Sequence, residues 1–92
     1  MPRLSLFSAY DVQQKLAKTV RQRRKQLKLS RQALAERSTV PAPTIKKFET
    51  TGQISLRQFI LLWQCVDDLG RLLELSKTSA QEPRSIEDVL KQ

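Results

Sequence analysis

Helix-start signals divide this chain into short segments and limit what it can fold into. A serine stands immediately before each of four segments with helical spacing: Ser8, Ser30, Ser55 and Ser85. Serine is a preferred N-cap because its hydroxyl accepts a hydrogen bond from a backbone N–H of the first turn. Asp11 and Gln58 follow Ser8 and Ser55 by three residues, as in a capping box. These signals predict short helices joined by tight turns.

Apolar spacing and prolines set the expected helix bounds. Val12, Leu16, Val20 and Leu27 form one stripe at helical spacing. Pro41 and Pro43 place the start of a third helix near residue 42, because proline is tolerated only in the first turn. We expect five helices, at residues 9–27, 31–37, 42–52, 56–66 and 71–75. An arm over 1–8 would precede the domain at 9–76, and a linker with a short C-terminal helix would occupy 77–92.

The charge distribution favours a polyanionic partner. The 92 residues suit one domain with a net charge of +8. Eleven Lys or Arg and a single acidic residue lie between Lys15 and Lys47, whereas acids outnumber bases seven to five between Phe48 and Gln92. A basic half joined to a mildly acidic half is expected when one face meets polyphosphate and another meets protein. The alternative is a solvated basic helix.

Several function classes find little support in the residues. The chain has no His, no metal-ligand spacing and no Gly-rich phosphate loop, so we expect neither an enzyme nor a metal or cofactor. The pairs Asp67-Asp68 and Glu87-Asp88 are interpreted as solvated turn and cap residues. Cys65 is interpreted as a small buried hydrophobe. The longest apolar run, Phe59 to Trp63, is too short to span a bilayer. The alternative of a membrane-surface protein finds little support, because the exposed side of the basic helix at 9–27 has no Trp or Phe anchor beyond Phe7. The single Cys65 has no partner for a disulfide within the chain, which favours a reducing, cytoplasmic location.

The segment from Arg21 to Leu69 has the order of helices expected around a DNA-reading helix pair. Apolar residues are spaced to hold the helices at 31–37 and 42–52 together: Leu34, Ala35, Val40, Ile45 and Phe48. The opposite side of the second helix would present Pro43, Thr44, Lys46, Lys47 and Thr50 outward. In helix-turn-helix proteins the second helix of such a pair enters the major groove.

The stretch RQRRKQLKLSRQALAERSTVPAPTIKKFETTGQISLRQFILLWQCV resembles the Xre/Cro (lambda-repressor-like) helix-turn-helix family. The matching positions are Arg24, Leu29, Leu34-Ala35, Val40, Thr44-Ile45, Phe48-Glu49, Gly52 and Leu56. The segment FETTGQISL is similar to the HipB-type antitoxin branch. The resemblance implies a compact, all-α, five-helix lambda-repressor-like domain with a short C-terminal extension.

The resemblance also implies roles for single residues. Arg24 would pair with Glu49 and clamp the reading helix, the alternative being one more phosphate-facing cation. Arg31 would contact the DNA backbone at a helix N-terminus. Ser30 would donate to phosphate or act only as an N-cap.

Base reading would come from the helix at 42–52. The family reads bases from the positions of Ala42, Pro43, Thr44 and Lys47, but Ala42 and Pro43 offer at best contact with a thymine methyl. Thr44, Lys46 and Lys47 remain as polar readers, with Lys46 equally suited to phosphate, and Thr50 would contact phosphate where the helix ends. This pattern raises the expected share of shape readout.

A single small domain needs a second half-site for high specificity, which predicts a homodimer on a palindromic operator. Its interface is expected from apolar residues of the acidic half: Ile60, Leu61, Leu69, Leu72, Leu73 and Leu75. Trp63 is expected in the core, the alternative being an anchor at this interface. The predicted function is a repressor that regulates its own toxin-antitoxin operon as the HipB-like component, in a bacterial cytoplasm. The alternative is an antitoxin or adaptor that mainly holds a toxin, a HipA-like kinase.

Overall fold

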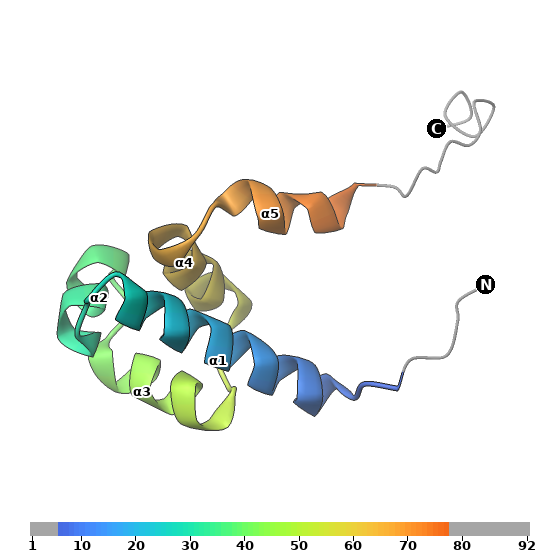
Figure 1. Ribbon diagram of the computed structural model, residues 1–92, viewed down its shortest axis with the longest axis horizontal. Helices are drawn as coiled ribbons and strands as arrows, with labels where there is room; N and C mark the ends of the chain where they lie inside the picture. Colours follow the sequence, from blue (N-terminus) through green and yellow to red (C-terminus); the bar gives the residue numbers. More distant parts are fainter. Residues whose placement is uncertain (1–5, 78–92) are drawn as a thin grey trace.

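The computed structural model describes residues 6–77, and every regular element in this range is helical (Figure 1). Five α-helices are followed by one 3-10 turn: α1 (Ala9–Gln26), α2 (Arg31–Ser38), α3 (Ala42–Thr51), α4 (Leu56–Val66), α5 (Leu69–Leu73) and η1 (Glu74–Ser76). The expectation of an all-α chain is confirmed for these residues. The predicted segment after Ser85 lies outside the described range. No helix of the described part is long and apolar enough to cross a membrane.

Serine side chains begin three of the helices. Ser8 and Asp11 form a complete capping box, because each side chain bonds the other's backbone N–H at 3.0 and 3.1 Å. Ser30 accepts from the N–H of Ala33. Ser55 accepts from the N–H of Gln58, but its hydroxyl also donates to the Gln58 side chain. The predicted capping box at Ser55 is therefore only half formed.

The connection between α2 and α3 is short and its backbone is hydrogen-bonded. Thr39 ends α2 in the left-handed region with φ 67°, and its N–H donates to the Ala35 carbonyl. The N–H of Val40 donates to the buried Ser38 hydroxyl. Pro41 is the N-cap of α3, and its carbonyl accepts the first N–H bonds of that helix. α2 includes Ser38, so the turn begins one residue later than expected.

One apolar core lies between the first four helices. Its fully buried side chains are Val20, Leu34, Val40, Ile45, Phe48 and Leu62. Phe59 contacts both Phe48 and Trp63, with ring centroids 5.9 and 5.8 Å apart. Trp63 is 5% exposed, so its expected core position is confirmed. Cys65 is half-buried against this core, and burial raises the pKa of its thiol.

The predicted apolar stripe of α1 is wrong at both ends. Val12 and Leu27 are about half exposed, and Leu27 lies beyond the last residue of the helix. The buried residues of α1 are Ala17, Val20 and Arg24. One turn after Val20, the buried face of α1 therefore continues with the cation Arg24 rather than with another apolar residue.

α5 also departs from its predicted bounds. It begins at Leu69 instead of Arg71, because the Asp68 side chain accepts the N–H of Gly70 and caps the helix. The remaining turn, predicted as helix, is the 3-10 segment η1. The indole N–H of Trp63 donates to the Asp68 carbonyl and holds the start of α5 to α4. Figure 1 shows α5 projecting away from the other helices.

Candidate nucleic-acid interface

A buried carboxylate joins the first three helices. The side chain of Glu49, on α3, has no exposed surface. Its Oε2 accepts from Arg24 Nε at 2.7 Å, and its Oε1 accepts from Arg24 Nη2 at 3.0 Å. Arg31, at the start of α2, donates its Nε to Oε1 at 3.0 Å. The expected pair of Arg24 and Glu49 is present, and Arg31 adds a third helix to it.

Arg24 and Glu49 have their hydrogen-bond partners inside the protein. Arg24 is 7% exposed, and its Nη1 donates to the Leu29 carbonyl at 2.8 Å. Burial raises the pKa of Glu49, but the hydrogen bonds and charges of Arg24 and Arg31 outweigh burial and lower the pKa below its ordinary value. Glu49 therefore remains ionised, and bidentate binding by Arg24 fixes the position of α3 against α1. This geometry excludes Arg24 as a cation on the surface.

The C-terminal end of α3 is held by α1. Gln14 Nε2 donates to the Thr51 carbonyl at 2.9 Å, and Gln13 Nε2 donates to the Gly52 carbonyl at 3.2 Å. Gly52 ends the helix with φ 81°, as expected for its C-cap position. Sequence reasoning missed both glutamines, since nothing in their spacing marks them as caps for another helix.

The outer face of α3 presents polar and cationic side chains to solvent. Pro43, Lys46, Lys47 and Thr50 are exposed, whereas Ala42 and Thr44 are half-buried. Within residues 6–77 no carboxylate forms an ion pair with either lysine. The Thr50 hydroxyl donates back to the Lys46 carbonyl at 2.9 Å, so only its lone pairs remain for a ligand. Ser30 is exposed at the start of α2, where it serves as the N-cap.

An open depression of about 410 Å³ lies between α3 and the start of α4. Pro43, Thr44 and Lys47 form its α3 side. The loop and α4 contribute two amide side chains, Gln53 and Gln58, that sequence reasoning did not include. From the sequence, Gln58 was identified only as a capping residue of α4. Its place at the start of that helix is the signal that could have predicted its position in the depression with Lys47.

A second ion-pair cluster pairs other charges of the described residues with one another. Asp67, with 9% of its side chain exposed, pairs with Arg23 and with Arg71. Both guanidinium groups also lie within 6 Å of the Trp63 ring centroid, at 5.7 and 5.9 Å. The interpretation of Asp67 as a solvated turn residue is therefore wrong, whereas Asp68 is an exposed cap as expected.

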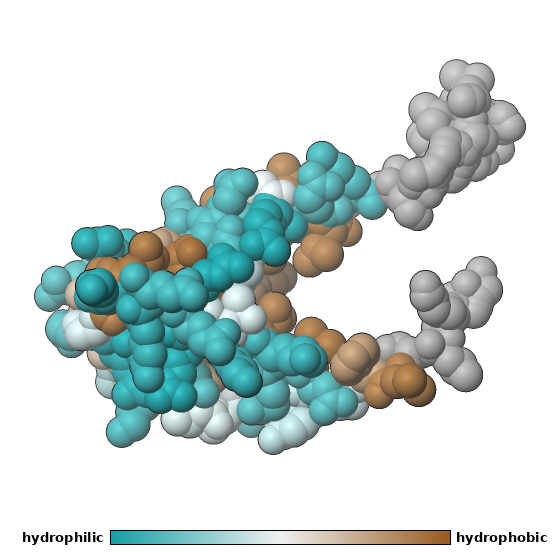
Figure 2. Space-filling view, in the orientation of Figure 1, coloured by the Kyte–Doolittle hydropathy of each residue, from teal (hydrophilic) through white to brown (hydrophobic). Residues whose placement is uncertain are grey.

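The residues expected at a dimer interface differ in how far they are exposed. Leu69, Leu73 and Leu75 are exposed, at 38%, 63% and 83%. Ile60, Leu72, Leu69 and Leu73 line a groove of about 390 Å³ between α4 and α5. Leu61 and Leu72 are partly buried against the core. Leu56, which is 73% exposed and was not predicted at an interface, adds to the apolar surface. Figure 2 shows apolar side chains on the inner side of the α5 projection.

No protein-family model, curated protein or solved structure matches the chain. A function for this chain must therefore be inferred from its residues and their geometry.

Proposed function

We propose that this chain is a helix-turn-helix protein that binds double-stranded DNA sequence-specifically, with α3 as the reading helix. The observation that supports this most strongly is the buried Glu49 pair. It fixes α3 on its inner side, while the outer side of the same helix presents Lys46 and Lys47, which pair with no carboxylate of residues 6–77. A firmly held helix with a cationic outer face suits entry into the major groove.

Phosphate contacts in this proposal come from the start of α2. Arg31 keeps 34% of its side chain exposed while its Nε is bound to Glu49. The N-terminus of a helix and a guanidinium both favour an anion at the same place. Ser30 lies at this end, and its hydroxyl proton is free to donate while its oxygen caps the helix. These contacts set the register of the protein but carry no sequence information.

Base contacts come from α3 and its depression. Lys47 suits the O6 and N7 acceptors of guanine, and Thr44 lies beside it in the same depression. Lys46 is exposed on the other flank and suits either a base or a phosphate. Ala42 and Pro43 offer apolar contact with a thymine methyl. With so few polar readers, DNA shape contributes a large part of the specificity.

Two copies are expected to bind a palindromic operator, in the manner of the lambda-repressor-like proteins that the sequence resembles. The exposed leucines of α5 and the groove beside Ile60 supply the interface between the copies. The homodimer acts as a cytoplasmic repressor of its own operon, as a HipB-like component of a toxin-antitoxin system does. The same leucines favour a second candidate function, in which α5 mainly holds a toxin protein such as a HipA-like kinase.

The test is fluorescence-anisotropy binding to the DNA upstream of the chain's own coding sequence and to a scrambled duplex, over a series of salt concentrations. A specific repressor prefers its own DNA by about 10³-fold or more. Lys47→Gln should remove most of this preference, whereas the matched Lys77→Gln, on an exposed lysine paired with Glu74, should not. Equal binding to both duplexes would contradict sequence specificity.

Dimerisation is tested separately, by sedimentation of Leu73→Glu. The glutamate should give a monomer that retains the wild-type fold and loses affinity for the palindrome. Wild-type protein that binds neither duplex would contradict DNA binding and leave the partner-holding function.

A further inference from the structure

A row of cations follows one face of α1 next to the proposed reading helix. Three cations follow Gln14 along the helix at steps of four, three and four residues: Lys18, Arg21 and Lys25. This spacing places all four side chains in one stripe of an α-helix. We call these three cations the α1 ridge. All three are exposed. Gln14 itself donates to the carboxyl end of α3, so the stripe that contains the ridge starts in contact with that helix.

Unlike Arg23 and Arg24 of the same helix, the three ridge cations have no ion-pair partner among residues 6–77; Lys15 has none either, but it lies off the ridge. Arg24 is buried against Glu49, and Arg23 is bound to Asp67 and lies over Trp63. Within the described residues no ion pair includes a member of the ridge. The acid nearest along α1 is Asp11, which closes the capping box one turn or more before the ridge. Three charges without an ion-pair partner in the described part of the chain therefore remain available to an external anion.

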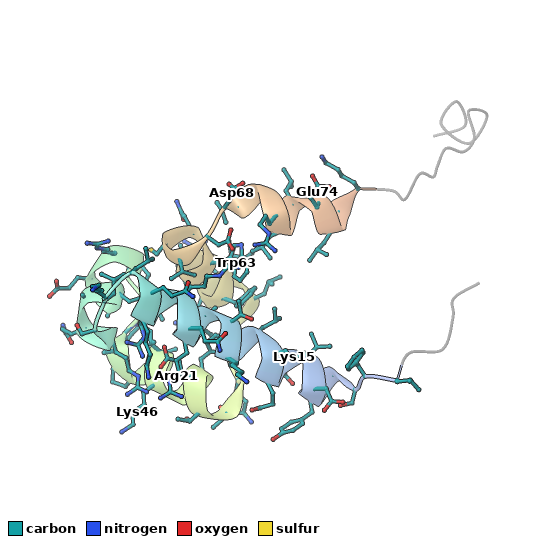
Figure 3. All side chains as sticks on the ribbon, viewed as in Figure 1. Lys15, Arg21, Lys46, Trp63, Asp68 and Glu74 are labelled. Carbon is teal, nitrogen blue, oxygen red and sulfur yellow. The ribbon has the colours of Figure 1, made fainter. Side chains whose placement is uncertain are left out.

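The ridge lies beside the helix that would enter the groove. Figure 3 shows Arg21 of α1 and Lys46 of α3 at the same end of the molecule, where the two helices pack together. From Lys18 to Lys25 the ridge is about 10 Å long at 1.5 Å per residue. One DNA strand presents about three phosphates over that axial length.

We infer that the α1 ridge binds the DNA phosphate backbone beside the groove that α3 enters, which extends the contact beyond the reading helix and the start of α2. This inference rests on the proposed DNA-binding function. The ridge adds affinity for any sequence, because backbone contacts do not distinguish bases. It also makes binding more sensitive to salt, because each neutralised phosphate releases counterions.

The experiment compares two triple variants of the full chain, each lacking three positive charges. The ridge variant is Lys18→Gln, Arg21→Gln and Lys25→Gln. The control variant is Lys15→Gln, Arg37→Gln and Lys77→Gln, which removes exposed cations that lie off the ridge. Glutamine is a good helix former, so both variants should fold, as circular dichroism will show. Binding to the upstream and scrambled duplexes is measured over the same salt series.

The ridge variant should lose up to about 2.7 from the slope of log K against log salt, at about 0.9 per phosphate contact. Its affinity should fall by a similar factor for both duplexes, and the control slope should stay within about 0.5 of wild type. Equal slopes for the two triples, or no change in the ridge variant, would overturn the inference while the proposed function stands. Wild-type protein that binds neither duplex would refute both. Should the ridge triple fail to fold, Arg21→Gln alone should lower the slope by about 0.9.

Discussion

The Glu49 cluster gives a direct test of how α3 is held. Glu49→Gln replaces the carboxylate with an amide of nearly the same size. The carboxylate accepts three charge-assisted hydrogen bonds, two from Arg24 and one from Arg31. Glutamine offers one oxygen acceptor, and its NH₂ group would face guanidinium donors. The substitution therefore leaves the charge of Arg24, which is 7% exposed, without compensation.

The loss of stability follows from this geometry. Removing one partner of a buried ion pair costs about 3–5 kcal/mol. Arg24 keeps its bond to the Leu29 carbonyl, and Arg31 is exposed enough to turn to water, so we expect the lower end, about 3 kcal/mol. For a domain of this size the Tm should fall by roughly 12 °C or more.

Urea unfolding followed by circular dichroism measures this difference. Glu36→Gln is the matched control, because Glu36 is an exposed glutamate of α2 and should change stability by no more than about 0.5 kcal/mol. The double variant Arg24→Met, Glu49→Leu should be less destabilised than the sum of the single changes, since it leaves no unpaired buried charge. A loss below about 1 kcal/mol in Glu49→Gln would show that the pair does not hold α3 as argued.

Three other features give further predictions. The pKa of Glu49 is lowered below 4.5, because its two arginine partners outweigh the effect of burial. The free energy that ionised Glu49 adds to folding is therefore present above this pH and is lost as the pH falls through the folded pKa. Urea midpoints should fall on acidification in wild type and less steeply in Glu49→Gln. Gly52→Ala should destabilise by about 1–2 kcal/mol in thermal unfolding, because φ is +81° and the new Cβ would lie 2.9 Å from Gln14 Nε2, and an unchanged Tm would contradict this. Asp67→Asn should cost about 1–2 kcal/mol and shift the fluorescence of Trp63, since both guanidinium groups over the indole lose their carboxylate; an unchanged emission spectrum would refute that link.

Local chemistry made the helix starts predictable from sequence. Ser8, Ser30 and Ser55 occupy the N-cap positions that their hydroxyl groups favour, and prolines mark the start of α3. The start of α5 was misplaced by two residues, because Asp68 was not assigned as its N-cap. Its side chain accepts the N–H of Gly70, and the Trp63 indole, which donates to the Asp68 carbonyl, adds a contact that the sequence does not reveal.

Contacts between helices were harder to predict from the sequence. The pairing of Arg24 with Glu49 was expected only from the family resemblance, and the participation of Arg31 was not expected. A basic segment offers several cations of equal chemistry, and only the docking of α1, α2 and α3 selects which ones reach the carboxylate. The same applies to Asp67, whose neighbours Arg23 and Arg71 come from two different helices.

Arg31 connects the internal cluster to the proposed DNA surface. Glu49 accepts a hydrogen bond only from Nε of Arg31, and the guanidinium has four further N–H donors on its terminal nitrogens. A phosphate at the start of α2 could therefore bind Arg31 without displacing it from Glu49. Lysine keeps the charge but has one ammonium group, which cannot hold both anions in the same planar arrangement. We therefore expect Arg31→Lys to weaken DNA binding on the order of tenfold, about 1.4 kcal/mol, with a smaller change in urea stability. Wild-type affinity in this variant would show that Arg31 acts as a point charge and that its link to Glu49 does not position it for phosphate.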